Sequence, residues 1–243
     1  MPITGTTVTG IDRWTWLYLT QRLALECGVS KDPWANILTL VGATEDVLRL
    51  ASWIQSAWRD IQDLEPNWKF MRRSCVFDTL AGQFEYTADQ AGIPADTFGR
   101  WKLDSFRCYP TGNTNGEMPM GTLDYDEWRD TYQFGSYRNV ITRPFVVTEL
   151  PDLSLGLGPT PPVGYTIVGD YYAAPKDLAN GTEVPLLPAR HNPLIVVYKA
   201  MMSYGSFEGA PEVYDRGKRE HDKLISRLRM YELPQIRFGG PLC

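Results

Sequence analysis

The sequence predicts an α+β fold, in which helices from both ends of the chain form one α-helical bundle and a large antiparallel β-rich region is inserted between them. The prediction rests on two changes in hydrophobic period. Apolar residues recur at helical spacing up to about residue 67, alternate with polar residues until about residue 188, and then return to helical spacing. Amphipathic helices must bury their apolar stripes against one another, so the helices of the two ends are expected to pack together. The predicted segments are residues 1–67, 68–188 and 189–233, followed by an extended tail over residues 234–243.

Three helical segments are expected before residue 67. The first spans Asp12 to Cys27 and ends at Gly28, since glycine accepts the left-handed conformation that often follows a helix. A short turn begins at Asp32-Pro33, where an N-cap precedes a proline. The third and most regular helix spans residues 44–64, with Thr44 as its predicted N-cap and one apolar stripe that includes Leu64.

Period-two alternation begins after Trp68. Residues 76–79 and 84–87 are predicted to pair as a hairpin around the turn at Ala81-Gly82, and a longer strand is expected over residues 98–109. A short helix over residues 123–134 interrupts the strands, because Asp124 and Glu127 resemble a capping box. Three further strands follow, which are predicted from the stretches PFVVTEL, LSLGLG and GYTIVGDYYAAP.

The C-terminal part of the bundle is predicted to contain two helices. Asn192-Pro193 begins the first, and Gly205 and Gly209 mark its end. Pro211 begins the second, whose inward face is expected to include Leu228 and Tyr231. Its other face is densely charged and is interpreted as solvated or as a polar subunit contact. Pro234 ends this helix.

Composition excludes several classes of function. The 243 residues carry a net charge of −5, which is unlike the basic footprint of a nucleic-acid-binding protein. The four cysteines lie far apart without a CxxC pair, as expected for free thiols rather than a metal site or disulfide framework. The N-terminus MPITGTTVTG lacks the features of a signal peptide, and the longest apolar run is too short to cross a bilayer.

The sequence offers no convincing catalytic or cofactor site. His191 and His221 are thirty residues apart without neighbours at metal-ligand spacing, so capping or surface roles are expected for both. The acidic residues at positions 124, 126, 127 and 130 lie near aromatic residues as in some glycosidases, but acids are also common in the first turn of a helix. We therefore expect no enzyme activity, no metal and no cofactor.

The order of several stretches resembles the head-to-tail adaptor (connector) proteins of tailed bacteriophages, the group that includes tail tubular protein A. These stretches are IQSAWRDIQDLEPNWKFMRR, the hairpin-like FDTLAGQFEYTA, and a long stretch from LSLGLGPTPPVGYTIVGDYYAAP to the apolar helix LIVVYKAMMSY, followed by a closing charged helix. The resemblance covers roughly residues 32–233 and is strongest over residues 155–204.

The resemblance implies a structural virion protein rather than an enzyme. Such proteins form a twelve-membered ring under the portal protein at the head-tail junction, extend the DNA channel and dock a downstream neck or tail protein. A host bacterial cytoplasm would be the site of synthesis, and DNA would pass through without specific binding. Acidic net charge suits such a channel, since each Lys or Arg contact with phosphate adds affinity.

The end of the last helix and the tail are the predicted partner-binding residues, toward the portal or a neighbouring subunit. Phe238 is the expected anchor of a tail that adds a strand to a partner or fills its groove. The predicted residues are Arg227, Arg229, Tyr231, Gln235, Ile236, Arg237 and Phe238.

Two alternatives remain open from the sequence. One is a carbohydrate-binding or carbohydrate-active β domain of a phage tail, with Trp101, Trp128 and Tyr132 as aromatic platforms. The other is a tail-completion or neck protein of different ring symmetry, because symmetry leaves no local mark in a sequence.

Overall fold

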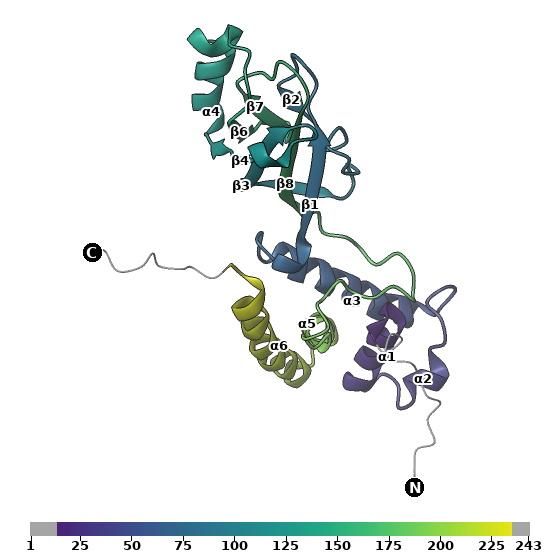
Figure 1. Cartoon of the computed structure of the whole chain (residues 1–243). Helices are drawn as coiled ribbons and strands as arrows, with labels where there is room; N and C mark the ends of the chain where they lie inside the picture. The colour runs from purple at the N-terminus through teal and green to yellow at the C-terminus, as the bar shows by residue number, and fades with distance from the viewer. Residues whose placement is uncertain (1–13, 235–243) are drawn as a thin grey trace, which may run out of the picture. The chain divides into compact units, whose positions relative to one another are not determined.

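A computed structural model describes residues 14–234, and its helices and largely antiparallel sheets confirm the predicted α+β class (Figure 1). The chain divides into two compact units, which we call the helical unit and the β unit. The helical unit combines residues up to Phe70 with those from Lys176 onward, and the β unit spans Met71–Pro175. The chain therefore leaves the helical unit after Phe70, forms the whole β unit, and returns to the helical unit at Lys176.

The helical unit contains five helices. They are α1 (Trp16–Glu26), α2 (Pro33–Asn36), α3 (Glu45–Asp63), α5 (Leu194–Glu208) and α6 (Pro211–Glu232). Helix α3 contacts α1 and α5, and α5 also contacts α1 and α6. Helices from before and after the β unit thus share one core, which includes Leu50, Ile54 and Trp58 of α3.

Indole hydrogen bonds reinforce this core. Trp16 donates from Nε1 to the Ala51 carbonyl at 3.0 Å, which joins α1 to α3. Trp58 donates from Nε1 to the Lys176 carbonyl at 3.1 Å, so the segment that returns from the β unit is tied to α3. A buried indole N–H is costly without a partner, and these bonds fix where the chain re-enters the bundle.

Helices α5 and α6 approach each other closely through two glycines. A Cβ on Gly205 would lie 2.7 Å from the Tyr214 backbone nitrogen, and one on Gly217 would lie 2.9 Å from the Tyr198 carbonyl oxygen. Gly209, with φ of 64°, ends α5 and allows the sharp reversal into α6. The expectation that Gly205 marks the end of α5 is therefore wrong. Gly205 lies inside the helix, at a position where the close approach of α6 leaves no room for a side chain.

The β unit is built from two four-stranded sheets. One has the order β1-β8-β3-β4 and the other β2-β7-β6-β5, and all neighbours are antiparallel except β5 and β6. The strands are β1 (Arg72–Asp78), β2 (Glu85–Tyr86), β3 (Phe98–Pro110), β4 (Met118–Pro119), β5 (Gly121–Thr122), β6 (Val146–Glu149), β7 (Leu155–Gly158) and β8 (Tyr165–Ala173).

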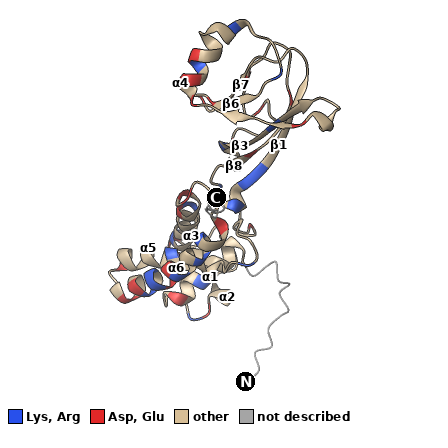
Figure 2. Cartoon of the chain, turned by 60° about the vertical axis from the view of Figure 1, so that its left-hand side comes forward, with Lys and Arg blue, Asp and Glu red and all other residues tan. Residues whose placement is uncertain are grey.

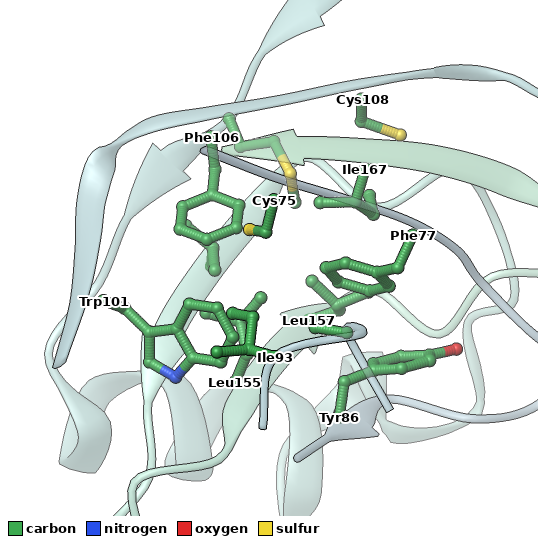
Figure 3. Packing of buried hydrophobic residues seen from close by; sticks show 13 residues of the cluster. Cys75, Phe77, Tyr86, Ile93, Trp101, Phe106, Cys108, Leu155, Leu157 and Ile167 are labelled. Carbon is green, nitrogen blue, oxygen red and sulfur yellow. The ribbon is translucent and has the colours of Figure 1, made fainter. Parts of the chain in front are cut away.

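Both sheets contribute to one aromatic-rich core (Figure 3). Phe106 and Trp101 of β3 pack edge to face at 5.8 Å between ring centroids, and Phe77 of β1 lies 5.2 Å from Tyr86 of β2. Gly169 of β8 leaves room for the Phe106 ring, since a Cβ there would lie 2.5 Å from it. The contact between Phe77 and Tyr86 joins the two sheets, whereas the other two lie within the sheet that contains β3 and β8.

A short helical column follows β5. It consists of α4 (Tyr125–Trp128), a π-helical turn η4 (Arg129–Gln133) and a 3₁₀ turn η5 (Ser136–Asn139). Asp124 is the N-cap as predicted, although its carboxylate accepts from the Asp126 N–H and no bond from Glu127 completes a capping box. Two further 3₁₀ turns are η2 (Lys69–Met71) and η3 (Thr114–Gly116).

Two local predictions are wrong, and a third holds in position only. The segments at 76–79 and 84–87 do not form a hairpin, because β1 pairs with β8 while β2 pairs with β7 in the other sheet. Thr44 is the N-cap residue of α3 as predicted, although its side chain makes no capping hydrogen bond. Leu64, placed on the buried stripe of this helix, is 42% exposed. The predicted start of the first helix at Asp12 lies outside the described residues.

Candidate partner-binding site

The end of α6 is fixed to the loop before α5 through one buried carboxylate. Glu232, on the last turn of α6, is 1% exposed. Its Oε1 lies 2.8 Å from Nε2 of His191 and accepts a hydrogen bond of 3.0 Å from Nε of Arg190, whose Nη2 also donates to it. The carboxylate thus joins two segments about forty residues apart in sequence.

Electrostatics keep this carboxylate charged. Burial acts to raise the pKa of Glu232, but the hydrogen bonds from Arg190 and His191 outweigh it and hold the pKa below 4.5, its ordinary value. A charged carboxylate with several donors is the arrangement that tolerates burial. The position of His191 differs from the expected capping or surface role, because its side chain is only 9% exposed.

Tyr231 lies beside this cluster on the outer side of the helix. Its ring centroid is 5.8 Å from the Arg190 guanidinium and 6.2 Å from the His191 ring, and its carbonyl accepts from Lys69 Nζ at 3.1 Å. Tyr231 is 53% exposed, so the prediction that it faces inward is wrong. The ring instead lies at the surface, with the Arg190 guanidinium over one face, and its exposed part is accessible to another molecule.

A groove of about 600 Å³ opens along this end of α6. Its size is within the range of ordinary ligand pockets. The lining combines apolar side chains with cations, a composition suited to a peptide that carries both apolar and acidic groups. The lining residues are Arg190, His191, Asn192, Ile195, Leu224, Arg227, Leu228, Met230 and Tyr231.

Arg227 differs from several other cations of α6 in having no ion pair. Arg216 pairs with Glu26 of α1, Arg229 pairs with Glu65 at 2.9 Å, and Lys223 pairs with Glu220 at 2.8 Å. Within residues 14–234, no carboxylate lies at ion-pair distance from the exposed Arg227. Its guanidinium is therefore free to bind an acidic group at the groove.

The structure separates the predicted binding residues into three groups. Arg227 and Tyr231 line the groove, whereas Arg229 is directed to Glu65 and holds α6 to the segment after α3. The predicted tail residues lie outside the described part of the chain; these are Gln235, Ile236, Arg237 and Phe238.

Sequence reasoning missed Arg190, His191 and Glu232. A signal was present, because Glu232 lies four residues after the buried Leu228 and seven after the buried Ile225. A carboxylate on a buried helical stripe requires a donor, and the ARHNP segment about forty residues earlier contains two. Which donors would reach it depended on the chain reversal between α5 and α6.

Burial contradicts the proposed sugar platforms of the β unit. Trp101 and Trp128 are 4% and 0% exposed, and Tyr132 is half-buried, so the two indoles cannot stack on a sugar. Within the described residues, no group of three His, Cys, Asp or Glu side chains could hold a metal ion. No helix in this part of the chain is long and apolar enough to span a membrane.

These features describe a two-unit α+β protein with a groove suited to a protein partner. The sequence matches the family model described as SU10 adaptor protein over residues 15–237, which is most of the chain and includes both units. The chain therefore belongs to this family of bacteriophage adaptor proteins, which are structural proteins of the virion. A search of curated proteins found no match.

Proposed function

We propose that this chain forms a ring, with twelve copies, that joins the portal protein of the capsid to a downstream neck or tail protein and extends the DNA channel. Family membership over residues 15–237 is the observation that carries the proposal. A tail-tubular-protein-A-like ring at the head-tail junction, assembled from chains made in the host cytoplasm, is the form that we infer. A neck ring of other symmetry is the competing form.

The groove at the end of α6 is the proposed contact with the portal or a neighbouring copy. Its partner supplies a carboxylate to Arg227 and an apolar side chain to the surface around Leu224 and Tyr231. Residues 235–238 follow the groove directly in sequence and extend the same contact. Charge complementarity of this kind fixes register and raises the rate of encounter more than it raises affinity.

Passage of DNA without specific binding is the second part of the proposal. The chain carries 24 Lys and Arg against 29 Asp and Glu, which gives a net charge of −5. Since tight binding to DNA depends on neutralising phosphates with cations, such a chain holds DNA weakly. A filter-binding measurement at physiological salt is expected to show no retention, and nanomolar retention would contradict this part.

Negative-stain microscopy of the purified chain, alone and mixed with the portal protein of the same phage, tests the ring. The expected result is a second ring stacked on the portal with twelve-fold symmetry. A ring of another symmetry would favour the neck-protein alternative, and a chain that ignores the portal would overturn the adaptor ring.

Arg227→Glu tests the groove in the same mixture. The reversal places a carboxylate opposite the partner's carboxylate and is expected to weaken portal binding about tenfold. Arg219→Glu is the matched control, because Arg219 is exposed on the same helix and does not line the groove. If both variants bound the portal as tightly as the unaltered chain, the groove would not be part of the portal contact.

A further inference from the structure

Exposed apolar side chains are concentrated in one stretch of the β unit, residues 134–145, which we call the 134–145 segment. Soluble proteins tolerate scattered exposed apolar residues, but a concentration of large ones marks an interaction surface. The exposed fractions are 62% for Phe134, 51% for Tyr137, 37% for Val140, 61% for Ile141 and 51% for Phe145.

Backbone bonds hold this segment in place. Ile141 forms a parallel bridge with Thr160, and the Thr142 N–H donates to the Thr160 carbonyl at 3.0 Å. The Phe145 N–H donates to the Gly158 carbonyl at 2.9 Å. The apolar side chains are therefore presented from a fixed backbone, which lowers the entropic cost of binding through them.

The 134–145 segment is also basic. It contains Arg138 and Arg143 and no acidic residue. Arg143 donates from Nη2 to the Cys108 carbonyl, which uses part of its guanidinium inside the unit. Arg138 is exposed, and no described residue offers it an ion pair. The surface thus combines apolar groups with an unpaired positive charge.

The complementary surface lies on the same unit. Asp126, Glu127 and Asp130 are exposed on α4 and η4, and no cation of residues 14–234 lies at ion-pair distance from them. Figure 2 shows acidic positions on this helical column in red, with basic positions in blue. Arg138 lies eight residues beyond Asp130, and the two do not form an ion pair in one copy.

We propose that the 134–145 segment of one copy packs against the acidic α4–η4 face of the next copy. The inference rests on the proposed ring, since it names the contact between neighbouring β units. A contact between two different patches of identical subunits is heterologous, and a heterologous contact generates a closed ring when the rotation between neighbouring copies closes. The two oppositely charged patches also set the direction of the ring, because like patches repel.

Two charge-reversed variants test this contact. Arg138→Glu replaces the unpaired cation of the 134–145 segment with a carboxylate and lowers the net charge of the segment to zero, and the double change Glu127→Lys with Asp130→Lys makes both patches basic. All three side chains are exposed, and Asp124, which caps α4, is retained. Each variant is mixed with the portal protein, and the number of bound copies is measured by light-scattering mass and negative-stain microscopy.

Each variant alone is expected to assemble about tenfold more weakly than the unaltered chain. An equimolar mixture of the two is expected to restore assembly, since alternating copies place opposite charges against each other at every contact. Lys31→Glu, an exposed change of equal charge in the helical unit, is expected to assemble normally.

Three results would overturn the inference in different ways. Normal rings from Arg138→Glu would exclude the 134–145 segment as the contact while the proposed ring stands. Loss of assembly that the mixture does not restore would show that the segment meets a different protein. Failure of the unaltered chain to form a ring on the portal would overturn the proposed function together with this contact.

Discussion

The helical unit and the β unit hold their parts together by different means. In the helical unit, ion pairs connect separate helices, as Arg216 does with Glu26 and Lys199 with Asp60. In the β unit, strand ladders and aromatic contacts join the parts, and the ion pair between Arg72 of β1 and Asp170 of β8 adds to one ladder. The acids of α4 and η4 take no part in this, because no cation of residues 14–234 lies at ion-pair distance from them. A unit that main-chain ladders stabilise can leave its charges available to partners.

The difference predicts where each unit tolerates substitution. At the glycines of α5 and α6, the backbone of one helix lies against the backbone of the other. A side chain added there would meet backbone atoms, which cannot rotate away as a side chain can. In the sheet, the neighbour of Gly169 is the side chain of Phe106. Its ring can shift to make room for an added methyl group. The helical unit should therefore be the less forgiving of added volume at its glycines.

Gly205→Ala is expected to have the largest effect, a loss of about 3 kcal/mol in the free energy of unfolding. The added methyl group would meet the Tyr214 backbone nitrogen at 2.7 Å and force α6 away from α5. Gly169→Ala is expected to cost less, about 1 to 2 kcal/mol, because the Phe106 ring can adjust. Urea unfolding measured by circular dichroism compares the two.

Ser206→Ala is the control for Gly205→Ala, since Ser206 is the adjacent exposed position on α5. It is expected to change stability by less than about 0.5 kcal/mol. A larger loss from Gly169→Ala than from Gly205→Ala would reverse the comparison between the two units and show that the β core is the more rigid.

Glu232→Gln is expected to have the next largest effect, about 2 kcal/mol at neutral pH, because it removes the charge from a buried carboxylate that Arg190 and His191 contact. The exposure of Arg190 reduces the effect from that of a fully buried pair. Urea unfolding as a function of pH measures the difference. Glu220→Gln, on the exposed face of the same helix, is expected to change stability far less.

The pH dependence has a definite sign. The folded-state pKa of Glu232 is below 4.5, its ordinary value, so folding releases protons near that pH. The stabilisation is fully present above about 4.5 and is lost as the pH falls through the folded-state value. The stabilities of the original chain and of Glu232→Gln should therefore converge in acid. A constant difference down to pH 3 would contradict the charged-carboxylate account.

Local signals predicted much of the fold because each needs only neighbouring residues. Asp32 caps α2 by accepting from the Ala35 N–H at 3.2 Å, and Pro211 begins α6, both as predicted. Pairing between distant segments could not be predicted this way. The turn at Gly82 exists, with φ of 81°, but its flanking strands separate into different sheets.

The candidate site was only half predictable for the same reason. Arg227 and Tyr231 were accessible to sequence reasoning because charged and aromatic residues near a helix end suggest an interface. Arg229 has the same local context, yet it pairs with Glu65, which is 164 residues earlier. Distinguishing a free cation from a structural one required knowledge of which helices pack together.

The last comparison concerns the rate at which a thiol reagent labels one cysteine of each unit, Cys27 in the helical unit and Cys75 in the β unit. Burial raises the pKa of Cys27 to about 12 and that of Cys75 to about 11. Since the thiolate is the nucleophile, Cys75 should react about 100-fold and Cys27 about 1,000-fold more slowly at pH 8 than an ordinary thiol. A Cys243→Ser background and peptide mass spectrometry after iodoacetamide treatment would separate the remaining sites.

The two thiols should respond to different variables. Cys27, between α1 and Gly28, is partly exposed, so thiolate formation limits its reaction and one pH unit should raise its rate about tenfold. Cys75 lies in the core between the sheets, so its reaction also requires opening of β1 and should accelerate in low urea. If Cys75 reacted as fast as Cys27 without urea, the β core would open more readily than its ladder and aromatic contacts imply. The ladder and aromatic contacts would then not hold the β unit closed as the comparison between the two units requires.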